Sequence, residues 1–183
     1  MKTLLHICCA PCSVACISKL KEEGIEPTGF WFNPNIHPVT EYRNRRDTLI
    51  SYAKEIGMEL FVDDTYGLRN FVRATADDIL ARCNYCYAVR FDAAAKYASE
   101  NGFDSFTSTL FISPYQDHDL MIKFAENAAK KYNVKFLYRD FRPYFREGQS
   151  IAREKGMYMQ KYCGCIFSEE DRYLKTDRKE KKQ

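Results

Sequence analysis

Short apolar stretches alternate with amphipathic stretches along most of the chain, and this alternation restricts its fold more than any other feature. Stretches with strand character cover residues 3–9, 27–33, 60–62, 105–110 and 134–140. Stretches with helical periodicity cover residues 12–23, 41–56, 85–101, 118–132 and 149–155, and residues 68–82 are helical in part. Strands and helices that alternate over short connections predict a single α/β domain over residues 1–175. We expect a Rossmann-like parallel sheet with helices on both faces.

The end of the first predicted strand carries an unusual group of thiols. Cys8 and Cys9 lie at this end, and Cys12 and Cys16 follow on the next predicted helix. Ligands of parallel α/β sheets bind beyond the carboxyl ends of the strands. Adjacent side chains of a strand point to opposite faces, so Cys8 and Cys9 can serve one centre only if the chain leaves the strand there. Pro11 favours such a departure, which makes this turn a candidate metal-binding turn.

The other four cysteines form two further compact groups. Cys83 and Cys86 are a C-x-x-C motif, and Cys163 and Cys165 are a C-x-C motif. No apolar run approaches the roughly 18 residues of a membrane span, and no signal-peptide pattern is visible, so we expect a cytoplasmic protein without membrane contact. Thiols stay reduced in the cytoplasm, where clustered cysteines indicate metal binding or redox chemistry rather than structural disulfides. Cys16 is expected to pack in the core.

The residue pattern leaves the kind of metal and the role of the C-x-C motif open. Thiolates are preferred ligands of both zinc and iron–sulfur clusters, but a zinc knuckle usually shows two regular C-x-x-C pairs. The thiols here are numerous enough for a four-cysteine cluster with some to spare. Cys163 and Cys165 could bind a second metal, form a strained disulfide that passes electrons, or serve a structural purpose only.

Polar residues follow the fourth predicted strand, at the edge where the thiols are expected. Ser113, Tyr115, Gln116, Asp117 and His118 could bind a polar substrate, and Asp117 or His118 could transfer a proton. The alternative is structural: Ser113 would cap the next helix, Asp117 would be a first-turn charge, and His118 would face solvent.

Two stretches, residues 42–46 and 138–146, combine arginines with tyrosine or phenylalanine. Arginine contacts phosphates, and aromatic rings stack on unpaired bases, so both stretches are candidates for RNA contact through Arg45, Arg142 and Arg146. Interspersed acidic residues make a solvated face the alternative. The formal net charge of +3 neither requires nor excludes a nucleic acid. Residues 176–183 form a charged tail that we expect to fray.

Four ordered motifs together resemble one known family. Residues 5–13 (LHICCAPCS), 83–87 (CNYCY), 113–116 (SPYQ) and 162–165 (YCGC) are similar to the cobalamin-independent epoxyqueuosine reductases of the QueH type. The resemblance extends from residue 4 to about residue 175.

This resemblance implies a function. Members of the family reduce the epoxide of epoxyqueuosine in the tRNA anticodon loop to give queuosine, the last step of queuosine synthesis. They carry a [4Fe-4S] cluster, with a second mononuclear iron proposed, on a sheet of the adenine nucleotide α-hydrolase type. The electron donor and the oligomeric state do not follow from the sequence.

The resemblance also implies residue roles. The expected cluster ligands are Cys8, Cys9, Cys83 and Cys86, with Cys12 an undecided metal ligand. Cys163 and Cys165 are expected to act as a redox pair or to bind the second metal. Two other classes stay open: a non-catalytic RNA-binding module stabilised by zinc or a cluster, and a metal-free thiol oxidoreductase.

Overall fold

Five parallel strands form a single sheet in the order β3-β2-β1-β4-β5 in the computed structural model, which describes residues 1–174. The strands are β1 (Thr3–His6), β2 (Pro27–Trp31), β3 (Leu60–Val62), β4 (Ser105–Ser108) and β5 (Lys135–Phe136). His6 is in register with Phe30 of β2 and with Ser108 of β4, so β1 and β4 end at the same level and β2 extends one residue further. The predicted tail 176–183 lies outside the described residues.

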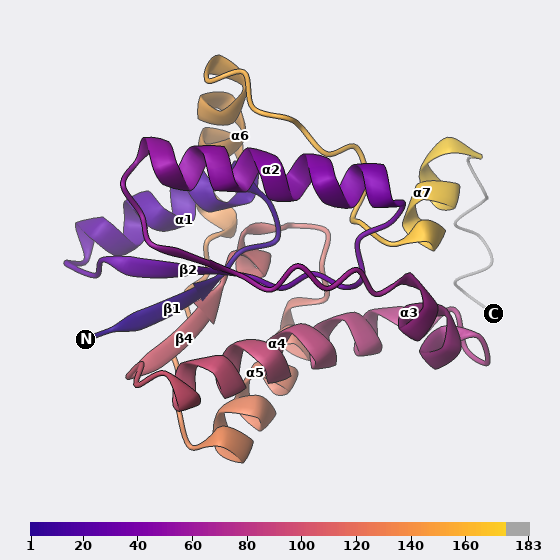
Figure 1. The fold of residues 1–183 in the computed structure, drawn as a ribbon, viewed down its shortest axis with the longest axis horizontal. Coiled ribbons are helices and arrows are strands. Elements are labelled where there is room, and N and C mark those ends of the chain that lie inside the picture. The colour runs from indigo at the N-terminus through magenta and orange to yellow at the C-terminus, as the bar shows by residue number, and fades with distance from the viewer. Residues whose placement is uncertain (175–183) are drawn as a thin grey trace.

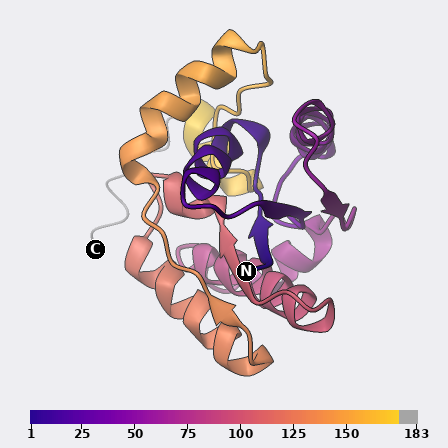
Figure 2. The same ribbon diagram turned by 90° about the vertical axis from the view of Figure 1, so that its left-hand side faces the viewer.

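Helices cover both faces of the sheet, as the alternation predicted. On one face lie α1 (Ala10–Glu22), α2 (Val39–Glu55) and α6 (Phe145–Glu154); on the other lie α4 (Arg82–Glu100) and α5 (His118–Tyr132) (Figure 1). The view turned by 90° shows the same two layers on either side of the strands (Figure 2). Two further helices, α3 (Leu68–Thr75) and α7 (Ile166–Tyr173), lie toward the carboxyl ends of the strands (Figure 1). No helix in residues 1–174 has the length and apolar character needed to cross a membrane.

The carboxyl end of β1 is fixed by His6, whose side chain is fully buried. Its Nε2 lies 3.1 Å from the Phe32 carbonyl oxygen, to which it donates, so Nδ1 accepts from the Ser108 hydroxyl at 2.9 Å. Burial, together with the nearby Arg90 charge, lowers the pKa of His6 to about 4, which keeps the ring neutral. The first strand stops at His6, three residues earlier than predicted.

Several predicted boundaries were wrong. The fifth strand is only two residues long instead of covering 134–140, and the chain beyond it passes through the 3-10 turn η2 (Arg142–Tyr144) into α6. The fourth strand ends at Ser108, where the 3-10 turn η1 (Thr109–Ile112) begins. Helix α7 was not predicted, because its short sequence, half of it charged, gives little apolar periodicity.

Candidate metal centre at the carboxyl edge of the sheet

Three cysteine thiols meet just beyond the end of β1. Because the strand stops at His6 and α1 starts at Ala10, Cys8 and Cys9 occupy a turn and need not face opposite sides of the sheet. The Sγ atoms of Cys8, Cys9 and Cys12 all lie within 4.8 Å of one another, and the Cys8 and Cys9 sulfurs are 3.9 Å apart. The departure from the strand that the sequence required is confirmed. Cys16, one turn further along α1, is fully buried in the main core.

Hydrogen bonds make Cys8 the most acidic thiol of this group. Its pKa is lowered well below the ordinary thiol value because of its hydrogen bonds with the Cys12 and Cys9 thiols. The Thr109 hydroxyl, 3.4 Å from the Cys8 sulfur, acts in the same direction. The pKa of Cys12 is raised, mainly because its proton is held by Cys8.

Two buried arginines face these thiols. The charge of Arg90, on α4, lowers the pKa of Cys8, and the charge of Arg45, on α2, lowers that of Cys9 against the larger effect of burial. Both side chains are almost completely shielded from solvent. Positive charge in a low-dielectric site stabilises thiolates, which are the form of cysteine that binds metal.

Gln160 is a site residue that sequence reasoning missed. Its side-chain Nε2 donates to the Cys9 sulfur at 2.9 Å and to the Cys12 sulfur at 3.3 Å. It lies about 150 positions from these cysteines, and no local motif marks it. In the sequence, only its position three residues before Cys163 could have indicated that it belongs to the site.

The remaining four thiols form a second group. Cys83 and Cys86 lie in the first and second turns of α4, and Cys86 and Cys165 pack with Phe71 in a small apolar cluster. Burial raises the pKa of Cys86, and the charges of Cys165, Cys163 and Cys83 raise it further. All eight cysteines are free thiols.

The structure does not bring Cys83 and Cys86 into the close group of Cys8, Cys9 and Cys12. The charge of Arg90 nevertheless acts on both groups: it lowers the pKa of Cys8 and opposes the larger effect of burial on the pKa of Cys86. Its Nε donates to the Cys86 carbonyl oxygen at 2.8 Å. Arg90 is therefore held beside Cys86, and its charge acts on both thiol groups.

The C-x-C segment is held against the N-terminal half of the chain by Arg45. Its guanidinium donates to the carbonyl oxygens of Tyr162 and Cys163, each at 2.9 Å, and pairs with Glu41 at 2.6 Å. The side chain is only 2% exposed, so the prediction that Arg45 contacts tRNA does not fit its position. Its buried charge is used to position the C-x-C backbone.

His37 also holds this segment through hydrogen bonds. Its backbone N–H donates to the Gly164 carbonyl oxygen at 2.7 Å. Its ring Nε2 lies 3.2 Å from the Pro34 carbonyl oxygen and donates to it, so Nδ1 accepts from the Ile166 backbone N–H at 3.3 Å. An added Cβ at Gly164 would lie 3.2 Å from the Ile36 side chain, which shows how closely the segment packs.

One of the predicted substrate-binding residues after β4, Gln116, lies beside the C-x-C motif. The Gln116 amide donates to the Cys163 sulfur at 3.1 Å and accepts from the buried Tyr87 hydroxyl at 2.5 Å. Tyr115 is 83% exposed next to it.

The structural alternative placed the helix cap at Ser113 and a first-turn charge at Asp117, but the cap of α5 is Asp117. The Asp117 carboxylate caps α5 by accepting from the Leu120 N–H, whereas the Ser113 hydroxyl accepts from the Tyr115 N–H within a turn. His118 lies 2.9 Å from the Tyr138 hydroxyl, and burial lowers its pKa. Neither Asp117 nor His118 has a hydrogen bond to a thiol among the contacts of residues 1–174.

The two other predicted tRNA contacts are exposed. Arg142 pairs with Asp140 at 2.7 Å, and Arg146, in the first turn of α6, makes no salt bridge with any residue in the described range. Both therefore keep a surface position from which a phosphate can be reached.

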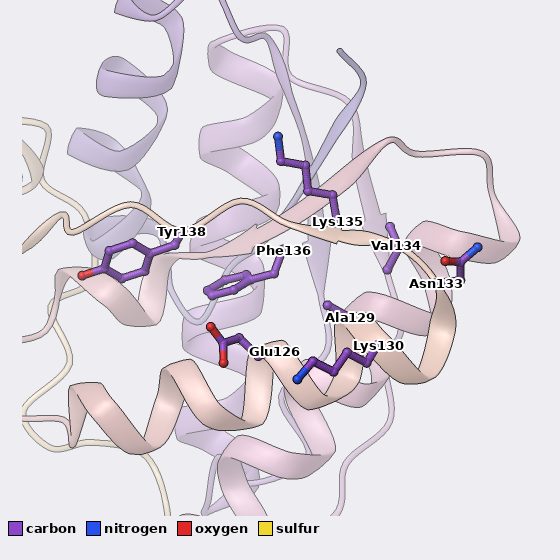
Figure 3. A pocket seen from close by; sticks show the side chains of 8 residues that line it. All are labelled: Glu126, Ala129, Lys130, Asn133, Val134, Lys135, Phe136 and Tyr138. Carbon is purple, nitrogen blue, oxygen red and sulfur yellow. The ribbon is translucent and has the colours of Figure 1, made fainter.

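A pocket of about 570 Å³ lies elsewhere, along α5 and β5 (Figure 3). Its lining includes Glu126, Lys130, Lys135, Phe136 and Tyr138, but no cysteine. The thiol chemistry of the molecule is therefore not in this pocket.

The fold and the site together define a class. An all-parallel sheet of order 3-2-1-4-5, with thiols where related sheets bind phosphate, is a Rossmann-like sheet with a thiol-rich edge. Solved structures share this fold. The U34-tRNA thiolase NcsA from Methanococcus maripaludis with its [4Fe-4S] cluster superposes with a TM-score of 0.59 at 16% identity, covering 92% of this chain and 61% of NcsA. A predicted subunit of tRNA methyltransferase from Methanocaldococcus jannaschii gives 0.52 at 15% identity, covering 88% and 94%.

The sequence comparisons are more specific. The family model described as epoxyqueuosine reductase QueH matches residues 3–171, so this chain belongs to the QueH family. An epoxyqueuosine reductase QueH from Dehalococcoides mccartyi is 35% identical over 96% of this chain and 97% of its own length. One from Haemophilus influenzae is 39% identical over 93% of this chain and 72% of its own. The resemblance deduced from the four motifs is confirmed.

Proposed function

We propose that this chain reduces epoxyqueuosine in the anticodon loop of tRNA to queuosine, using a bound [4Fe-4S] cluster. The observation that carries the proposal is the close group of Cys8, Cys9 and Cys12 at the carboxyl edge, in a chain that matches the QueH family over residues 3–171. Such an enzyme works on tRNA, in agreement with the cytoplasmic location expected from the sequence.

The donor set suits an iron–sulfur cluster. Thiolates are the usual protein ligands of such clusters, and Arg45 and Arg90 offset negative charge in the buried site. The assigned ligands are Cys8, Cys9, Cys83 and Cys86, and the proximity of Arg90 to both thiol groups supports this pairing. The position of Cys12 beside Cys8 and Cys9 makes it the alternative ligand. When bound, the cluster would supply electrons and a Lewis-acidic iron.

Cys163 and Cys165 can supply the reducing equivalents. Conversion of an epoxide to an alkene breaks two C–O bonds and consumes two electrons and two protons, and the oxygen leaves as water. Oxidation of two thiols to a disulfide releases two electrons and two protons, so the reaction balances. An external reductant then restores the dithiol. The alternative use of the pair, as ligands of a second mononuclear iron, predicts additional iron that a Cys163→Ser variant would lose.

The residues around the motif position the reactants. The Gln116 amide holds the Cys163 sulfur, and Arg45 and His37 hold the backbone on both sides of it. Ser113 and Tyr115 lie in the same exposed turn and are assigned to the substrate, with Arg142 and Arg146 as phosphate contacts. His118 is the proposed proton donor in preference to Asp117, whose carboxylate already caps α5.

Anaerobic purification followed by iron, sulfide and zinc analysis tests the cofactor. We expect four irons and four sulfides in each chain, a brown chromophore, and conversion of epoxyqueuosine-containing tRNA measured by nucleoside mass spectrometry. Colourless protein with zinc would indicate an RNA-binding module, and full turnover by metal-free protein would indicate a thiol oxidoreductase. Either result contradicts the proposal.

Cysteine substitutions test the ligands. Cys83→Ser and Cys86→Ser are expected to lose the chromophore and iron, whereas the buried control Cys16→Ala keeps both. If Cys12→Ser loses the cluster while Cys83→Ser keeps it, the ligand assignment moves to the group of Cys8, Cys9 and Cys12.

A further inference from the structure

Gln160 reaches the thiol group from a segment whose backbone is fixed on both sides. Two residues before it, the Tyr158 hydroxyl donates to the buried carboxylate of Glu41. Two residues after it, the Tyr162 hydroxyl donates to the His37 carbonyl oxygen at 2.7 Å. The amide of Gln160 is therefore held over the sulfurs of Cys9 and Cys12, at 2.9 and 3.3 Å from Nε2.

The other end of this amide lacks a partner. The Gln160 Oε1 is buried and accepts no hydrogen bond from the described residues. An unpaired buried oxygen costs free energy, which the two N–H···S contacts must offset. Such contacts are strong when the sulfur carries negative charge, as it does when it binds a metal. The orientation of the amide is thus suited to anionic sulfur.

We propose that Gln160 sets the reduction potential of the cluster by donating hydrogen bonds to its ligand sulfur, chiefly that of Cys9. This inference rests on the proposed function. Reduction adds negative charge to the cluster, and a donor aimed at a ligand sulfur stabilises the reduced form more than the oxidised form. Removal of the donor therefore moves the midpoint potential to a more negative value.

The test is a redox titration of the cluster in purified holoprotein, followed by electron paramagnetic resonance. Gln160→Met keeps the length of the side chain and removes the N–H donor. At the wild-type midpoint potential, we expect the ratio of oxidised to reduced cluster to rise about tenfold, equivalent to a shift of about 59 mV for one electron. The matched control is Gln116→Met, which removes an amide donor from Cys163 instead and is expected to change the ratio less than about twofold.

The outcomes are distinct. If Gln160→Met holds its full iron content and has the same midpoint potential as the wild type, this inference is overturned and the proposed function stays intact. Wild-type protein without a cluster would overturn both. If Gln160→Met does not hold iron, the wild-type protein labelled with 15N in its glutamine side chains gives the answer. A nitrogen coupling to the reduced cluster that persists in Gln116→Met supports the assignment, and its absence from wild-type protein refutes it.

Discussion

Arg45 and Cys163 are joined by a hydrogen bond of 2.9 Å from the guanidinium to the carbonyl oxygen, although 118 positions separate them in the sequence. The same guanidinium contacts the Tyr162 carbonyl oxygen and pairs with Glu41. Helix α2 thus holds the C-x-C motif in place through a buried charge. Because a buried charge without a partner is costly, every member of this network depends on the others.

Loss of the Arg45 guanidinium is expected to destabilise the protein strongly. Arg45→Met leaves the Glu41 carboxylate buried without its partner and removes the donors to two carbonyl oxygens. We expect the free energy of unfolding, measured by urea titration, to fall by about 3–5 kcal/mol. Arg43→Met, on the exposed side of the same helix, is the control and should change it by less than about 0.5 kcal/mol. Equal effects of the two substitutions would argue against the network.

Tyr87 and Gln116 are expected to act as one unit. The Tyr87 hydroxyl donates to Gln116 Oε1, which turns the amide nitrogen toward the Cys163 sulfur. We expect Tyr87→Phe to lower kcat/KM about tenfold, equivalent to about 1.4 kcal/mol. In a double-mutant cycle, Tyr87→Phe added to Gln116→Leu should cause little further loss, because the hydroxyl then has no amide to orient. Fully additive losses in kcat/KM would show that the residues act independently.

Tyr115 is expected to stack on an unpaired base of the tRNA. Its ring is 83% exposed, lies next to Gln116 and meets the Phe145 ring edge-on at 6.0 Å. Tyr115→Ala should weaken tRNA binding by about 1–3 kcal/mol, whereas Tyr115→Phe keeps the stacking surface and the affinity. Fluorescence anisotropy at fixed salt measures both. A phenylalanine variant as weak as the alanine variant would assign the role to the hydroxyl group instead.

His37 is expected to make the protein sensitive to acid. Burial lowers its pKa from 6.5 to about 4. A charged ring would also lose the hydrogen bond from the Ile166 N–H. The unfolded chain therefore takes up a proton first as the pH falls. The contribution of His37 to the free energy of unfolding is fully present above about pH 6.5. It decreases by up to about 3 kcal/mol by pH 4.

Urea unfolding between pH 7 and pH 4.5 checks this, with His37→Gln as the comparison. The variant should lose less stability over this range than the wild type. An identical pH dependence in the two proteins would exclude His37 as the source.

The sequence by itself determined the layer architecture and the chemistry of the edge. Apolar runs of strand length, separated by amphipathic stretches that end in glycine, allow few arrangements other than a parallel sheet between helices. Cys8 and Cys9 at the end of the first run therefore had to lie at the ligand-binding edge. The four motifs, each local in sequence, also identified the family, which the match over residues 3–171 confirms.

Only the tertiary structure decided which residues surround the thiols. Gln160, Arg90 and His37 lie in no cysteine motif, and each reaches the site because the fold brings distant segments together. Arg45 shows most clearly what the sequence could not predict. Its basic, aromatic stretch favours a surface contact, but the ion pair with Glu41 allows the side chain to be buried. Periodicity reports which face of an element is apolar. It does not report which distant polar groups satisfy one another inside the folded chain, and those pairings shape this site.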